Sequence, residues 1–144
     1  PLDSNEPWLS SAFARVTDAI RLATDADVPV DRVLLLGFSQ GAGVVSEYVA
    51  RTPRRYGGLV ALSGSLLGPE ISRAYEGSIE GTPVFFGCSG DDPHVPPERV
   101  RESASVFEGL AGEVTCRLYD DLGHAINDDE IHTIDAFVGR LLGA

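Results

Sequence analysis

The chain has 144 residues, of which 43% are hydrophobic and 23% charged, a composition typical of one globular domain with a single core. Eleven basic residues stand against 22 acidic ones, so the formal net charge is −11. Such a charge repels nucleic-acid backbones and anionic lipid surfaces, and we expect no nucleic-acid partner. No apolar run approaches the roughly 20 residues of a membrane span, so none is expected.

The start of the chain and its cysteines bear on where the protein acts. The first residue is Pro1 rather than methionine, so whether native residues precede it stays open, and no signal peptide is visible. Cys88 and Cys116 are too few for a disulfide framework. We expect reduced thiols buried in or near strands, with one bridge between neighbouring strands as the alternative. This usage fits a reducing compartment, and we expect a cytoplasmic protein.

The first part of the chain predicts a helix, a strand and a second helix. Asn5 followed by Pro7 is typical of a helix start. The apolar residues that follow at helical spacing are Leu9, Phe13, Val16, Ile20 and Ala23. The unbroken apolar run 33–36 predicts a strand covered on both faces. Residues 41–51 return to a helical pattern.

The second part of the chain continues the alternation. Strands are predicted at 59–63, 83–87 and 114–119, with a helix from Pro97 that ends at Gly112. Residues 64–81 form the one long connection, and loops of that length in compact domains are often functional.

The last helix has a start signal of its own. Asn127, with Glu130 three residues later, resembles a capping box. The residues predicted to be buried on this helix are Ile131, Ile134, Phe137, Val138 and Leu141. Strands joined through helices imply parallel pairing with right-handed crossovers. We therefore predict one α/β domain over residues 1–144, with a mostly parallel sheet of about four strands flanked by helices.

One serine lies where the apolar strand 33–36 meets the next helix. Residues 37–41 fit Gly-x-Ser-x-Gly, with Ser39 at the turn between strand and helix. The turn lifts the hydroxyl clear, and side chains at Gly37 or Gly41 would collide with it or with the sheet. The following helix aims free N–H groups at that point. The alternative is a plain glycine turn with an incidental serine.

A serine nucleophile needs a base, and the base needs an orienting acid. His124 follows the strand 114–119, while Asp91 and Asp92 follow the strand 83–87. All of these lie at carboxyl ends of strands, where the sites of open parallel sheets gather. The order serine, acid, histidine is the order that a strand–turn–helix nucleophile requires, and either aspartate could serve.

The other polar residues near these motifs have plainer interpretations. Asp120 and Asp121 are interpreted as loop carboxylates, with a backup acid as the alternative, and His94 is placed at the rim of a pocket. His132 lies on the last helix and is expected at the surface. Three histidines without ligand spacing predict no metal site.

These motifs together resemble the carboxylesterase and acyl-protein thioesterase family of α/β-hydrolases, also called phospholipase/carboxylesterases. The elbow Gly-Phe-Ser-Gln-Gly, the run Asp-Pro-x-Val-Pro that begins at Asp92, and the Gly-His pair before the last helix carry the resemblance. It implies a catalytic triad of Ser39, Asp92 and His124, an oxyanion donor at the Gln40 N–H, and no cofactor. The resemblance also identifies Asp92, rather than Asp91, as the catalytic acid, and Asp91 is then expected to be a solvated turn residue.

The chain also departs from that family. Complete members carry several strands upstream, one of which ends in a glycine-rich loop that supplies a second oxyanion donor. The resemblance therefore implies a truncated three-layer sandwich in which the strand 33–36 lacks one neighbour. Open strand edges attract partners. We expect a homodimer, or another partner that completes the sheet.

The expected function is that of a serine hydrolase that cleaves carboxylic acyl esters or thioesters through an acyl-enzyme. Leu66, Leu67 and Val95 are the candidate residues of an apolar acyl pocket. The alternative is a catalytically impaired, truncated hydrolase that serves as a binding or assembly module.

Overall fold

The computed structural model describes residues 6–143, so the predicted cap at Asn5 lies outside the described residues. Its elements in chain order are α1 (Trp8–Asp25), the short 3-10 helix η2 (Val30–Arg32), β1 (Leu34–Phe38), α2 (Gln40–Arg51), β2 (Gly58–Leu62), β3 (Pro83–Ser89), α3 (Pro97–Gly109), β4 (Glu113–Tyr119) and α4 (Asp128–Leu141). None of the helices in these residues is both long enough and apolar enough to cross a membrane.

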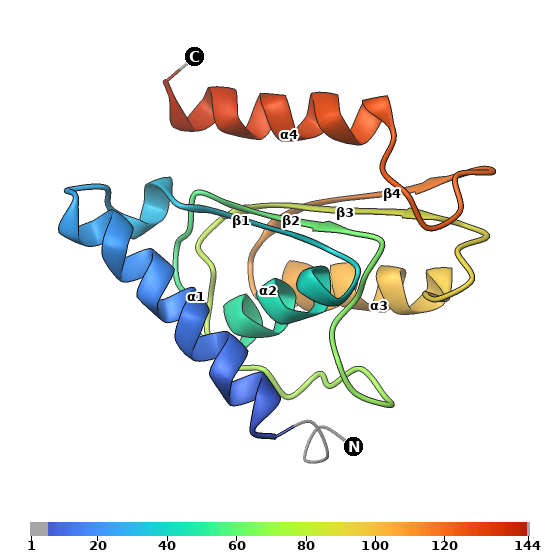
Figure 1. Ribbon diagram of the computed structural model, residues 1–144, viewed down its shortest axis with the longest axis horizontal. Helices are drawn as coiled ribbons and strands as arrows, with labels where there is room; N and C mark the ends of the chain where they lie inside the picture. The colour runs from blue at the N-terminus through green and yellow to red at the C-terminus, as the bar shows by residue number, and fades with distance from the viewer. Residues whose placement is uncertain (1–5, 144) are drawn as a thin grey trace.

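The four strands form one parallel sheet in the order β1-β2-β3-β4. Figure 1 shows three layers, with α1, α2 and α3 on one face of the sheet and α4 on the other. Each parallel connection needs a crossover, and helices or the long segment between β2 and β3 supply it. The predicted α/β class and parallel sheet are confirmed.

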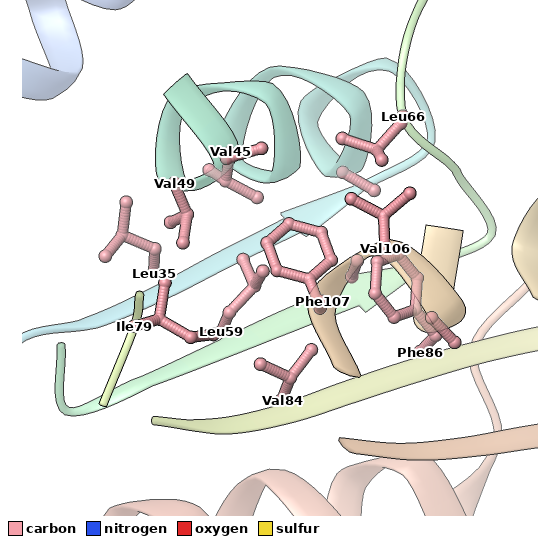
Figure 2. Close-up of a cluster of buried hydrophobic side chains, with 14 of the residues drawn as sticks. Leu35, Val45, Val49, Leu59, Leu66, Ile79, Val84, Phe86, Val106 and Phe107 are labelled. Carbon is pink, nitrogen blue, oxygen red and sulfur yellow. The ribbon is translucent and has the colours of Figure 1, made fainter. Parts of the chain in front are cut away.

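The main core lies between the sheet and the two helices α2 and α3. Both central strands, β2 and β3, are buried along their whole length. The side chains drawn and labelled in Figure 2 are Leu35, Val45, Val49, Leu59, Leu66, Ile79, Val84, Phe86, Val106 and Phe107. Leu66 and Ile79 come from the long connection, so that connection is part of the core at two points.

The opposite face of the sheet is covered by α4 only in part. Phe137, with Ile134 beside it, packs on a smaller cluster of β-strand side chains formed by Val60, Leu62, Phe85 and Leu34. Ile131 and Val138 were predicted to be buried, but they are 45% and 39% exposed. These two side chains lie on the flank of α4 that Phe137 does not bury, and no other helix in residues 6–143 covers this face.

The prediction that β1 is covered on both faces is wrong, again because α4 covers its face of the sheet only in part. Leu35 and Gly37 are buried on the α2 side, but Leu36 is 44% exposed and Phe38 is 37% exposed. In the described part of the chain β1 is an outer strand that pairs only with β2. The apolar run was thus a correct signal for a strand, although one face of that strand meets solvent here.

The predicted start of α4 is confirmed, and the predicted end of α3 is wrong. The capping box of α4 is present, with the Asn127 side chain accepting from the Glu130 N–H and the Glu130 side chain accepting from the Asn127 N–H. Helix α3 ends at Gly109 rather than at Gly112, and the left-handed residue beyond it is Ala111, at φ 62°.

The two cysteines only partly match their prediction. Both are free, so the alternative of a bridge between strands is wrong. Cys88 is buried on the central strand β3, as predicted. Cys116 is exposed on the outer strand β4, so the burial predicted for it is wrong.

Candidate active site

Ser39 lies at the sharp turn between β1 and α2. Its backbone has φ 57° and ψ −119°, a left-handed conformation that costs free energy for any residue other than glycine. A Cβ on Gly37 would lie 2.3 Å from the carbonyl carbon of Gly41, so the turn closes only with glycine at position 37. The collision expected at Gly41 does not occur, because a Cβ there would meet nothing within 4 Å.

The structure brings Ser39, His124 and Asp92 into one hydrogen-bonded chain. The Ser39 Oγ lies 2.8 Å from the His124 Nε2, and the His124 Nδ1 lies 2.8 Å from the Asp92 Oδ2. With the Nδ1–H directed at the carboxylate, the Nε2 is free to accept the serine proton. The three residues come from the turns that follow β1, β3 and β4.

Asp92 is a buried carboxylate whose oxygens are well supplied with donors. Its Oδ1 accepts from the backbone N–H groups of His94 at 2.8 Å and Val95 at 3.2 Å. Burial by itself raises the pKa of this carboxyl. The His124 hydrogen bond, the two backbone N–H groups and the His124 charge together outweigh burial and hold the pKa of Asp92 below its ordinary value.

A buried thiol also faces this carboxylate. The Cys88 Sγ lies 3.8 Å from the Asp92 Oδ2, close enough for a weak S–H hydrogen bond. Burial, reinforced by the negative charge of Asp92, raises the pKa of Cys88 to about 12. The thiol therefore stays protonated and acts here as a donor.

The imidazole of His124 is fixed by its neighbours. Phe38 lies on one side with its ring centroid 5.0 Å away, and His94 meets the ring edge-on at 4.8 Å. The loop that carries His124 is tied to the end of β3, where the Leu122 N–H donates to the Ser89 Oγ at 3.2 Å. The capping box of α4 fixes the other end of this loop.

A cavity of about 360 Å³ opens beside Ser39. It is lined by Ser39, Gln40, Gly43, Ser63, Gly64, Ser65, Leu66, Leu67, Gly68, His94, Val95 and Arg99. All three candidate pocket residues are in this lining, but the Leu66 side chain is buried in the main core. Gln40 is the first residue of α2, so its backbone N–H has no acceptor within the helix.

The sequence model of the phospholipase/carboxylesterase family matches residues 3–142. The chain belongs to this family. An acyl-protein thioesterase 1 from Gibberella zeae is 31% identical over an alignment of 130 residues that covers 85% of this chain and 54% of that protein. An acyl-protein thioesterase 1 from Kluyveromyces lactis is 25% identical over an alignment of 138 residues that covers 93% of this chain and 60% of that protein.

The fold of the family is also found in the structural comparison. The crystal structure of a phospholipase/carboxylesterase from Dyadobacter fermentans matches with a TM-score of 0.89 and 36% identity, over 99% of this chain and 67% of that one. The resemblance to an α/β-hydrolase of this family is therefore confirmed. The chain spans between about half and two thirds of the length of these relatives.

The other polar residues that the sequence analysis singled out lie outside the hydrogen-bonded chain of Ser39, His124 and Asp92. Asp91 is exposed, and its Oδ1 accepts from the Ser89 hydroxyl and from the Gly123 N–H. Asp120 and Asp121 are exposed on the loop after β4. His132 is exposed on α4. Within residues 6–143 no three His, Cys, Asp or Glu side chains lie together as metal ligands would.

Two polar residues next to the cavity were missed by the sequence interpretation. Glu47 is fully buried on α2, and Arg99 in the first turn of α3 lines the cavity. A signal for Glu47 existed, because a carboxylate between Ser46 and Tyr48 interrupts the buried side of that helix. Arg99 gave no comparable signal, since arginine near the start of a helix is usually solvated.

Proposed function

We propose that this chain carries the reacting residues of a serine hydrolase that cleaves carboxylic acyl esters or thioesters. The observation that carries the proposal is the unbroken hydrogen-bonded chain from the Ser39 hydroxyl through His124 to the buried Asp92. Membership of the phospholipase/carboxylesterase family supports the same reaction class.

In the proposed acylation, the Ser39 Oγ attacks the substrate carbonyl carbon while the His124 Nε2 takes the hydroxyl proton. Asp92 holds the Nδ1–H tautomer and stabilises the imidazolium that forms. The tetrahedral intermediate then collapses, the bond to the leaving oxygen or sulfur breaks, and the imidazolium returns its proton to the departing alcohol or thiol. The product of this half-reaction is an acyl ester of Ser39.

Deacylation repeats the same steps with water. The His124 Nε2 takes a proton from water, the hydroxide attacks the acyl carbonyl, and the second tetrahedral intermediate expels the Ser39 oxygen. Ser39 regains the proton from the imidazolium, and the carboxylic acid is released. In both halves the Gln40 N–H is the proposed donor to the oxyanion, where a single donor contributes about 3 kcal/mol.

A further part of the proposal concerns the outer edge of β1. Leu36 and Phe38 expose apolar surface on this strand, and β1 has an unpaired backbone edge in the described residues. We propose that a second copy of the 144-residue chain covers this edge and supplies the second oxyanion donor. Activity would then depend on protein concentration.

The same edge favours the alternative function, a binding or assembly module that keeps the triad without turnover. A fluorophosphonate probe separates the two functions, because it forms a covalent bond only with an activated serine. We expect labelling of Ser39 and hydrolysis of a short p-nitrophenyl ester, and Ser39→Ala should abolish both.

The expected loss of turnover in Ser39→Ala is on the order of a thousandfold or more, with little change in the melting temperature, because one hydroxyl leaves a surface turn. Ser11→Ala on the exposed side of α1 is the matched control. Absence of labelling in the wild type would favour the module, and full activity in Ser39→Ala would remove the triad assignment.

A further inference from the structure

The segment between β2 and β3, residues 63–82, contains no helix or strand, yet part of it forms one side of the cavity beside Ser39. We call residues 65–69 the wall segment. Backbone groups outside helices and sheets need other partners when they are removed from water. In the wall segment these partners are side chains from α2 and α3.

Glu47 on α2 is the first of these partners. Its buried Oε1 accepts from the Leu67 N–H at 2.9 Å, and the Tyr75 hydroxyl donates to the same carboxylate at 2.8 Å. Burial and the negative charge of Glu47 raise the pKa of Tyr75, which keeps the hydroxyl a donor. Arg51 supplies the opposite charge at 2.9 Å, so the carboxylate is paired. Glu47 thus ties α2 to the connection at two points.

Arg99 on α3 binds the wall segment from the other side. Its guanidinium donates to the Leu66 carbonyl at 2.9 Å, the Gly68 carbonyl at 2.8 Å and the Pro69 carbonyl at 3.1 Å. The Nε also donates to the Ser65 hydroxyl at 3.3 Å. These acceptors are neutral oxygens of a single loop, and only a planar fork with several donors can reach them all. Ser103 adds one more contact by accepting from the Leu66 N–H at 2.9 Å.

The side chains of the wall segment are oriented by these bonds. Leu66 points into the main core, whereas Leu67 is half-buried at the cavity. The Leu67 side chain packs against Gly43 in the first turn of α2, where an added Cβ would lie 2.5 Å from the Leu67 Cδ2. Leu67 therefore packs on the first turn of α2 and lines the same cavity as Ser39 and Gln40.

We propose that Glu47 and Arg99 are positioning residues that fix the wall segment, so that Leu67 presents a preformed apolar surface to the acyl chain of the substrate. This inference rests on the proposed function and adds to it two residues that set how strongly the site distinguishes long acyl chains from short ones. When the wall segment is already ordered, binding does not pay the entropy cost of ordering it. A long acyl chain that contacts the wall benefits from this, and a short one that does not reach it does not.

The test compares two esters, p-nitrophenyl acetate and p-nitrophenyl octanoate, in Arg99→Lys. The lysine keeps the charge and loses the fork. For octanoate we expect KM to rise about fivefold or more with kcat within about twofold, and for acetate both constants should stay within about twofold. Arg101→Lys, on the exposed side of the same helix, is the matched control and should leave both esters unchanged.

Tyr75→Phe tests the Glu47 side without emptying the buried site, which is useful because Glu47→Gln can fail to fold. It should shift the octanoate constants in the same direction as Arg99→Lys, by a smaller factor. Hydrogen exchange gives a readout that needs no turnover. The Leu66 and Leu67 amides should exchange about tenfold faster in Arg99→Lys than in the wild type or in Arg101→Lys.

Equal losses for acetate and octanoate in Arg99→Lys would overturn the proposal, as would amides that exchange equally in all variants. If the wild type labels with fluorophosphonate but Arg99→Lys changes acetate and octanoate hydrolysis equally, the proposed function stands and the wall proposal is refuted. A wild type that hydrolyses neither ester would refute the proposed function, and the exchange rates alone would then decide whether Arg99 fixes the wall segment.

Discussion

The two outer strands of the sheet, β1 and β4, differ in what they expose. Glu113, Thr115 and Arg117 alternate along β4 as exposed polar residues on the side that faces α4, where Arg117 pairs with Asp129 at 2.9 Å. On β1 the exposed side chains are Leu36 and Phe38. Charged and polar residues are how natural proteins keep an outer strand from pairing with another chain. The composition of β4 suits an edge that stays in water, and that of β1 suits an edge that is covered.

The same two strands end next to the two groups that exchange a proton. Ser39 follows β1 and His124 follows β4, although three strand spacings, about 14 Å, separate the outer strands. The loop after β4 therefore reaches back across the strand ends, and its bond to Ser89 at the end of β3 holds it there. The acid thus follows the fully buried strand β3, and the loop of the base is tied to the end of that strand, while the nucleophile depends on β1.

The largest expected effect comes from removing the charge of Asp92, the residue after β3 that orients His124. In Asp92→Asn the imidazole loses both its orienting acceptor and the charge that stabilises its cation, so ester hydrolysis should fall by a factor on the order of 10³ to 10⁴. Asp91→Asn should change it by no more than about threefold, because Asp91 touches the His124 loop only through Gly123. Steady-state ester hydrolysis by the two variants measures both effects. If Asp91→Asn lost far more activity than Asp92→Asn, the catalytic acid would be Asp91 instead.

Much of this site could be predicted because its signals are local. The glycine at position 37, the serine two residues later and the strand before it are adjacent in the chain. Asp92 follows a strand that is visible as an apolar run, and His124 follows one in which apolar residues are mixed with polar ones. The structure brings these three residues within hydrogen-bond distance of one another.

The wall segment could not be predicted, because its contacts join residues far apart in sequence. Leu67 and Glu47 are 20 residues apart, and Leu66 and Arg99 are 33 apart. Nothing in the residues 64–81 themselves specifies which side chains will satisfy their backbone groups. The exposure of Leu36, Ile131 and Val138 was missed for a different reason: an apolar residue on a strand or helix predicts a face that prefers cover, but not whether the described chain provides it.

A smaller effect should separate the two outer strands directly. Leu36→Lys places a charge on the exposed apolar face of β1 and should weaken self-association about tenfold or more, while Thr115→Lys on the already polar β4 should leave it within about twofold. Sedimentation velocity over a dilution series measures both, with ester hydrolysis followed in the same samples.

The outcome of that dilution series also tests the proposed partner. A wild type that dimerises and loses specific activity on dilution supports the second copy as the occupant of β1. A wild-type monomer with unchanged specific activity at nanomolar concentration would contradict it, and would mean that the N–H groups at the start of α2 suffice for the oxyanion.

The smallest expected effect is on stability in acid. It is measured by comparing Asp92, the buried carboxylate after β3, with Asp129, an exposed carboxylate beside β4. Because the pKa of Asp92 is held below its ordinary value of 3.8, the folded state binds fewer protons at this carboxyl than the unfolded chain does. Its contribution to stability is therefore complete above that ordinary value and is lost as the pH falls through the folded-state pKa. Wild type and Asp92→Asn should differ most in free energy of unfolding near neutral pH.

Asp129 provides the matched carboxylate for this measurement. Hydrogen bonds from Tyr119 and Arg117 lower its pKa in the same direction, but the group is half exposed and water screens its partners. Urea unfolding followed from pH 6 down to about pH 2.5 should show the gap between wild type and Asp92→Asn narrowing, with a smaller change for Asp129→Asn. A gap for Asp92→Asn that stays constant into acid would mean that the variant acts by packing alone, and that the hydrogen bonds from His124, His94 and Val95 do not favour the charged form of Asp92.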